Sequence, residues 1–67
     1  MTKKITHWTT ERASREVGQG RAELALRPSG FADVLVRRNR ILHVVGWLSA
    51  SQVVGVRLDN PSMGILR

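Results

Sequence analysis

The sequence predicts a small α+β fold, mostly β, in which a short N-terminal helix precedes a three- to four-stranded antiparallel meander. Three observations favour this class. A helix-start signal lies near residue 10, apolar side chains alternate with polar ones after Gly20, and valines crowd residues 34–56. With 67 residues, the chain has room for one small domain, residues 1–67, and for a modest core.

The N-terminal part predicts an arm or a short first strand over residues 1–9 and a helix over residues 10–18. One of the two threonines before Glu11 can cap this helix, and an acidic side chain in the first turn suits the helix dipole. Gly18 can end it. So short a helix is not stable alone, and Trp8 is the natural anchor for packing it.

The antiparallel sheet is expected over residues 21–58. Ala22, Leu24 and Leu26 fall on one face of its first strand because strand side chains alternate between faces. A turn at residues 28–30 follows. The later strands are expected over residues 31–36, 41–48 and 53–58, with a C-terminal tail over residues 59–67.

A single helix over residues 31–48 is the alternative for the middle of the chain, because its apolar residues also satisfy helical spacing. The valine content, Gly46 within the segment and the turn-forming Asn39 favour two strands instead. The choice decides whether the arginines in this region lie at a hairpin tip or on a helix surface.

The main functional signal is the group of Arg37, Arg38 and Arg40 in a stretch, residues 34–56, that contains no acidic residue. Guanidinium groups offer planar sets of donors that suit phosphates. A hairpin that carries three of them can therefore lie along a nucleic-acid backbone or enter a groove. Charges at a tip can also serve only to keep a hairpin soluble and its edges unpaired.

The formal net charge of +6 is consistent with a nucleic-acid partner, DNA or RNA. The expected function is that of a small basic nucleic-acid-binding protein, for example a phage or plasmid regulator. For Trp8, base stacking competes with packing against the helix or a partner chain. The expected contact residues are Arg37, Arg38, Arg40, Lys3, Lys4, Arg12, Arg15 and Trp8.

Two other functions stay open. The chain can be a protein-interaction module, an inhibitor or adaptor that offers its basic tip or a sheet edge to a larger acidic protein. It can also be a structural assembly subunit that uses its aliphatic strands as the contact. A chain this short without cysteine has no disulfide to stabilise it, so a homo-oligomer is expected in each case.

An enzyme is not expected, because the serines occupy helix and turn positions and the acids are scattered. Neither a cofactor nor a metal is expected, since His7 and His43 match no ligand spacing. His43 is expected to be a core or interface group on one strand face with Ile41, Val45 and Trp47. The lack of a secretory signal or a long apolar run predicts a cytoplasmic protein without a membrane partner.

Residues 33–60 partly resemble the bent β-meander of the Sm-type RNA-binding proteins, with Gly46 placed where those proteins bend a strand. The resemblance implies an oligomeric ring that reads RNA. The asparagine and aspartate that mark that family before its bent strand are not in place here. The resemblance therefore extends to a bent meander and does not assign the family.

Overall fold

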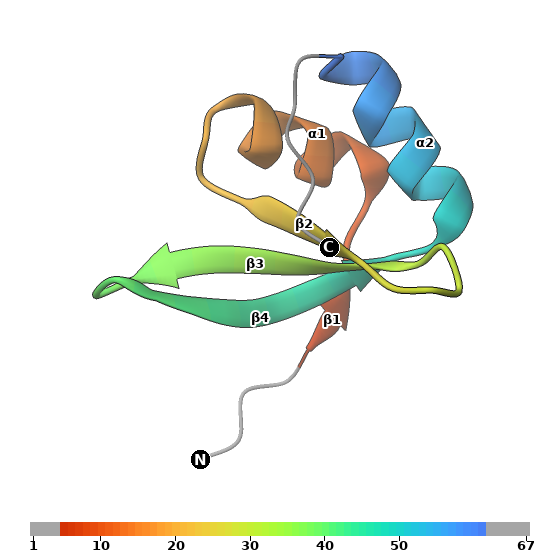
Figure 1. The fold of residues 1–67 in the computed structure, drawn as a ribbon. Coiled ribbons are helices and arrows are strands. Elements are labelled where there is room, and N and C mark those ends of the chain that lie inside the picture. The colour runs from red at the N-terminus through yellow and green to blue at the C-terminus, as the bar shows by residue number, and fades with distance from the viewer. Residues whose placement is uncertain (1–4, 62–67) are drawn as a thin grey trace.

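The structure, a computed structural model, describes residues 5–61, in which two helices lie on one face of a four-stranded sheet (Figure 1). The predicted α+β class is confirmed. The sheet is mixed, however, because β1 pairs in parallel with β4, and one of the two helices follows the sheet. The elements are β1 (Thr6–His7), α1 (Thr10–Gly18), β2 (Glu23–Leu26), β3 (Ala32–Arg38), β4 (Ile41–Leu48) and α2 (Ala50–Asp59).

Helix α1 has the predicted bounds. The Thr9 hydroxyl accepts a hydrogen bond from the backbone N–H of Arg12 at 3.1 Å, which satisfies one of the free donors at the helix start. Ala13 is fully buried, and Trp8 is only 4% exposed just before the helix. Trp8 is therefore part of the core on which α1 packs.

The sheet order is β1-β4-β3-β2, and β2, β3 and β4 form the antiparallel meander that the sequence predicts. Strands β3 and β4 are joined by two residues, Asn39 and Arg40, with φ angles of 52° and 68°. Positive φ at both positions matches a type I′ turn, whose twist suits a tight hairpin. Two strands, over residues 32–38 and 41–48, thus form in this segment, and the alternative helix over residues 31–48 is excluded.

Residues 53–58 were expected to be a strand, and this prediction is wrong: they lie within helix α2. Ser49 and Gln52 form a capping box that starts the helix. Val53 and Val56, three residues apart, then both reach the core. Packing at helical spacing has overridden the strand preference of valine. The sheet consequently ends at Leu48, and the resemblance to an Sm-type meander ends there too.

Strand β4 contains a β-bulge at Val45. Leu35 pairs with Val44 whereas the preceding Val34 pairs with Gly46, so β4 has one extra residue at this point. Residues that pair across antiparallel strands share a face. Leu35 and Asp33, two residues apart on β3, share a face, so their partners Val44 and Trp47 share that face too. Without the bulge, the odd separation of Val44 and Trp47 in the sequence would place them on opposite faces.

The bulge also corrects the predicted surroundings of His43. His43 pairs with Val36, which packs against the core, whereas Trp47 pairs with Asp33 on the opposite face. His43 and Trp47 thus do not share a face. His43 is half-buried on the side of the sheet that the helices cover.

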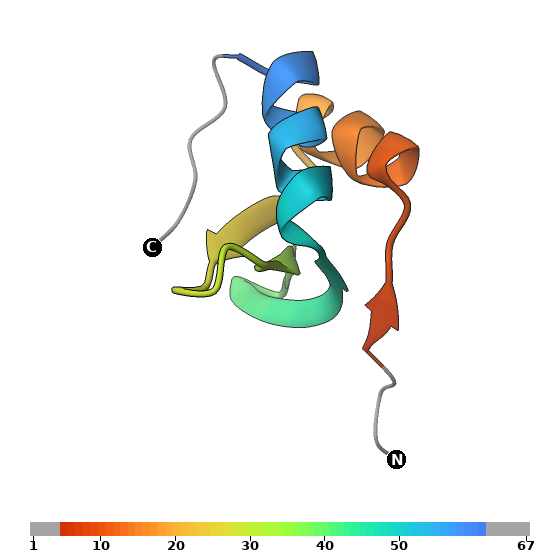
Figure 2. The ribbon, with the colours of Figure 1, turned by 90° about the vertical axis from the view of Figure 1, so that its right-hand side faces the viewer.

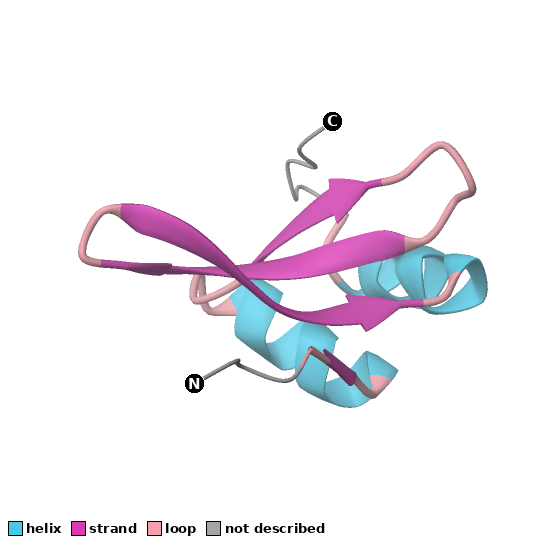
Figure 3. Cartoon of the chain, turned by 90° about the horizontal axis from the view of Figure 1, so that it is seen from below, coloured by secondary structure: helices cyan, strands magenta, loops and turns pink. Residues whose placement is uncertain are grey.

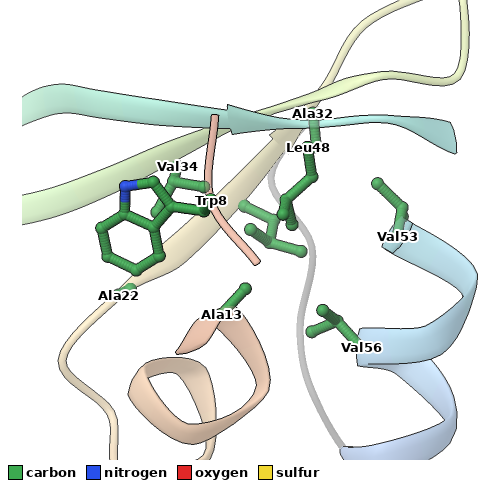
Figure 4. Close-up of a cluster of buried hydrophobic side chains, with 9 residues drawn as sticks. Trp8, Ala13, Ala22, Ala32, Val34, Leu48, Val53 and Val56 are labelled. Atoms are coloured by element: carbon green, nitrogen blue, oxygen red, sulfur yellow. The ribbon is translucent and has the colours of Figure 1, made fainter. Parts of the chain in front are cut away.

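The core lies between the sheet and the two helices. Figure 2, turned by 90° from Figure 1, shows both helices above the sheet. Figure 4 shows its side chains meeting from both layers, with Val34 and Leu48 from the sheet opposite Ala13 and Val56 from the helices. The opposite face of the sheet is covered by neither helix (Figure 3). Side chains on this helix-free face are therefore not covered by α1 or α2.

Candidate nucleic-acid interface

The β3–β4 hairpin projects beyond both helices, with its turn at the far end of the sheet (Figures 1 and 3). Arg37 and Arg38 are the last residues of β3, and Arg40 is the second residue of the turn. All three side chains are exposed. We call these three arginines the basic tip.

The arginines of the basic tip do not all point to one side. Arg37 pairs with Leu42 and alternates with Val36, so it lies on the helix-free face; Arg38 pairs with Ile41 and lies on the other face. The hairpin end is therefore positively charged on both of its sides. Such an end can contact phosphates by lying along a nucleic-acid backbone or by entering a groove with a backbone on each side.

The basic tip differs in its partners from Arg21 and Arg27, which pair with acidic side chains. Arg21 donates to both carboxylate oxygens of Glu16, at 3.0 Å and 2.6 Å, and Arg27 Nη2 lies 2.7 Å from Asp33 Oδ1. The hydrogen bonds from Arg21 hold the pKa of Glu16 below its ordinary value. Within residues 5–61, no arginine of the basic tip makes an ion pair with an acid. Their charge is thus free to act on another molecule.

Arg40 occupies a backbone conformation that side chains disfavour. Its φ of 68° lies in the left-handed region, where a residue with a Cβ is strained by about 1–2 kcal/mol. Glycine is the usual residue at this position of a type I′ turn. An arginine here breaks a local rule at the exposed turn of the hairpin, which is the pattern expected of a functional position.

Arg12, Arg15 and Trp8, which were also predicted as contact residues, do not join the basic tip. The Arg12 guanidinium lies 3.9 Å from the centre of the Trp8 ring, and Arg15 Nε lies 3.6 Å from Glu16 Oε2. Both arginines are on α1, away from the projecting turn (Figure 1). Trp8 is buried and stacked by Arg12, so it offers no ring face to a base and packs as an anchor instead. Lys3 and Lys4 lie outside the described residues.

Sequence reasoning missed an aromatic row on the helix-free face. The ring of Trp47 stacks on His7, with centroids 4.2 Å apart, and on Phe31, with centroids 5.8 Å apart. Beside Phe31 and Trp47 lies a cavity of about 400 Å³. The lining residues are Ile5, Arg27, Ser29, Phe31, Ala32, Asp33 and Trp47. No local signal could reveal this row, because it depends on the pairing of β1 with β4, which places His7 beside Trp47.

Other functional groups are sparse in the part of the chain that the structure covers. Between residues 5 and 61, His, Cys, Asp and Glu side chains do not gather in threes as a metal site requires. Neither helix has the length and apolar character needed to cross a membrane. The basic tip and the aromatic row are therefore the two candidate binding features in the described part of the chain.

Comparison with protein-family models, with curated proteins and with solved structures finds no significant match for this chain. The functional argument consequently rests on the geometry described above.

Proposed function

We propose that this protein binds nucleic acid and contacts its phosphates through the basic tip. The observation that carries the proposal is Arg40, a charged residue held at φ 68° where glycine would relieve the backbone. Solubility alone does not need a charge at that position, since Arg37 and Arg38 already lie next to it. A projecting, unpaired cluster of guanidinium groups is suited to phosphate oxygens.

The overall charge supports the same proposal. The net charge of +6 attracts a polyanion over long range and speeds the encounter at low salt. Ion pairs occupy arginines elsewhere on the surface, including Arg21 and Arg27, so the basic tip is the place where this charge is least compensated among residues 5–61. A small regulator from a phage or plasmid is one setting in which such a protein would act.

The test is a binding titration with fluorescently labelled DNA and RNA across a salt series. Counterion release makes the logarithm of the affinity fall linearly with the logarithm of salt, by about 0.7–0.9 per phosphate contacted. Arg40→Gln should reduce this slope by roughly one contact. Arg57→Gln removes the same charge from an exposed position on α2 and should leave the slope unchanged.

Two results would contradict the proposal. One is absence of binding at low salt, and the other is an equal loss of slope in the Arg40 and Arg57 variants. The second would mean that net charge, and not the hairpin, governs the interaction.

Protein interaction is the second candidate function, and the free edge of β4 favours it. Strand β1 pairs only with Gly46 and Trp47, so residues 41–45 of β4 have no neighbour on that side within the described chain. Ile41 is 60% exposed at this edge. An unpaired edge with apolar side chains can accept a strand from another chain, including a second copy. Sedimentation at rising concentration tests the second copy, and a monomer throughout would exclude it.

A further inference from the structure

The cavity beside Phe31 and Trp47 has the chemistry of a site for a flat heteroaromatic ring. Phe31 is 40% exposed, so part of its ring is open to a ligand. The Trp47 ring stacks on Phe31 and also on His7, which holds the aromatic side chains together. The volume of about 400 Å³ lies within the range of small-molecule sites. An aromatic wall and an open mouth favour stacking of a planar group.

Polar groups at the rim suit the edge of such a ring. The Asp33 carboxylate accepts three hydrogen bonds from Arg27: Nε donates to Oδ1 at 3.1 Å and to Oδ2 at 3.2 Å, and Nη2 donates to Oδ1 at 2.7 Å. Both residues line the cavity. A carboxylate oxygen can also accept from an exocyclic amino group, and guanidinium N–H groups can donate to a ring carbonyl or a phosphate. Nucleobases carry these groups at their edges.

The cavity and the basic tip are connected along one face of the sheet. Asp33, Leu35 and Arg37 alternate on the helix-free face of β3. From Asp33 to Arg37 the strand rises about 13 Å, at roughly 3.3 Å per residue. Leu35 and Val44 pair between them, and the acidic Glu23 of β2, which pairs with Leu35, lies beside them on the same face. A few nucleotides of an extended strand can span this distance.

On the basis of the proposed function, we infer that the ligand is a single-stranded nucleic acid, one of whose bases stacks on Phe31 in the cavity while its backbone runs to Arg37. A base within a duplex is stacked between its neighbours and cannot enter a cavity on a sheet face. An unpaired base has both ring faces free. The helix-free face thus selects single strands, and the basic tip supplies the attraction to phosphate.

The test compares three labelled probes of equal length in a salt series that starts at low salt: a single strand, its duplex, and an abasic strand that keeps the phosphates but has no bases. The full chain should bind the single strand more tightly than the other two. Phe31→Leu, which keeps an apolar side chain but removes the ring, should weaken single-strand binding by at least about fivefold. It should leave the abasic strand unaffected, and Phe31→Tyr should restore binding.

A matched control is Val54→Ala, which trims an apolar side chain that is 57% exposed on α2, away from the helix-free face. Its affinity for every probe should equal that of the unchanged chain. A second readout is the indole N–H resonance, which should shift on titration with the single strand for Trp47 and not for the buried Trp8.

The outcomes separate this inference from the proposed function. If the abasic strand binds with a salt-dependent affinity but Phe31→Leu has no effect and the duplex binds equally well, the stacking site is refuted and phosphate binding by the basic tip stands. If no probe binds at low salt, the proposed function itself fails.

Discussion

The indole of Trp8 lies against the backbone of Gly46 and fills the space that a side chain at position 46 would occupy. The carbonyl oxygen of Thr6 bounds the same space, 2.7 Å from where a Cβ would lie. This close approach allows β1 to pair with β4 while Trp8 turns into the core. A glycine in β4 is therefore required by packing.

Gly46→Ala should destabilise the protein by about 1–3 kcal/mol, because the added methyl group collides with the Trp8 ring and with the backbone of β1. Chemical denaturation of the two chains measures the difference. Gly55→Ala is the matched control, since it makes the same change inside α2. The atom nearest to the added Cβ there is the Thr10 methyl carbon, at 3.0 Å. Helix propensity favours alanine there by up to about 1 kcal/mol. Equal losses in both variants would contradict the packing role of Gly46.

Elements with strong local signals were predictable from the sequence. Helix α1 has a threonine cap and a first-turn acid, and its bounds of Thr10–Gly18 are those predicted. Strand β4 also has its predicted bounds, Ile41–Leu48, because the turn at Asn39 separates two runs rich in β-branched residues. The position of the basic tip follows from the same local information.

Features that depend on packing were not predictable. The segment Ser49–Gln52 did carry the capping-box pattern of a helix start, but the following valines favoured a strand. Only the packing of Val53 and Val56 into the core, against α1 and the sheet, favours the helix α2 over a strand. The bulge at Val45 has no local signal, and without it Trp47 would not share a face with Val44. The aromatic row was hidden as well, because the pairing of β1 with β4 brings His7 beside Trp47.

Arg40→Gly should stabilise the hairpin and weaken nucleic-acid binding at the same time. Relief of the left-handed strain, about 1–2 kcal/mol, exceeds the extra chain entropy of glycine in the unfolded state, about 0.4–1 kcal/mol. A net gain of about 0.5–1 kcal/mol is expected in chemical denaturation. The slope of the logarithm of affinity against the logarithm of salt should fall by the same amount as in Arg40→Gln. A variant that is less stable than the unchanged chain would show that the Arg40 side chain serves the fold.

The ion pair between Glu16 and Arg21 should make stability fall in acid. Hydrogen bonds from Arg21 hold the pKa of Glu16 below its ordinary value of 4.5, whereas in the unfolded chain that value is restored. The pair therefore contributes stability above pH 4.5, and the contribution is lost as the pH falls through the lower pKa of the folded state. Glu16→Gln should lower the melting temperature at pH 7, and this effect should shrink as the pH falls below 4.5.

Glu11→Gln provides the control for this pH effect, because Glu11 is an exposed acid of α1 that makes no ion pair within residues 5–61. Its melting temperature should change with pH as that of the unchanged chain does. A Glu16 variant that keeps the full loss of stability between pH 7 and pH 3 would assign that loss to other carboxylates.

Gln52 connects the N-terminal segment to α2, and its removal should be costly. Its amide Nε2 donates to the Trp8 carbonyl oxygen at 2.8 Å, and its Oε1 accepts from the Ser49 backbone N–H at 2.9 Å. The same Oε1 lies 2.5 Å from His7 Nε2. Gln52→Ala removes a helix cap and a bond between β1 and α2, so a loss of about 1–3 kcal/mol is expected in chemical denaturation.

Gln52→Glu separates the two roles of this side chain. A carboxylate can still accept from Ser49, but it has no N–H to donate to the Trp8 carbonyl oxygen at neutral pH. Its stability should therefore fall between that of the unchanged chain and that of Gln52→Ala. The exposed Gln19, which follows α1, provides the control, and Gln19→Ala should leave stability within about 0.5 kcal/mol. If Gln52→Ala were equally mild, β1 would be held to α2 by Trp8 packing alone.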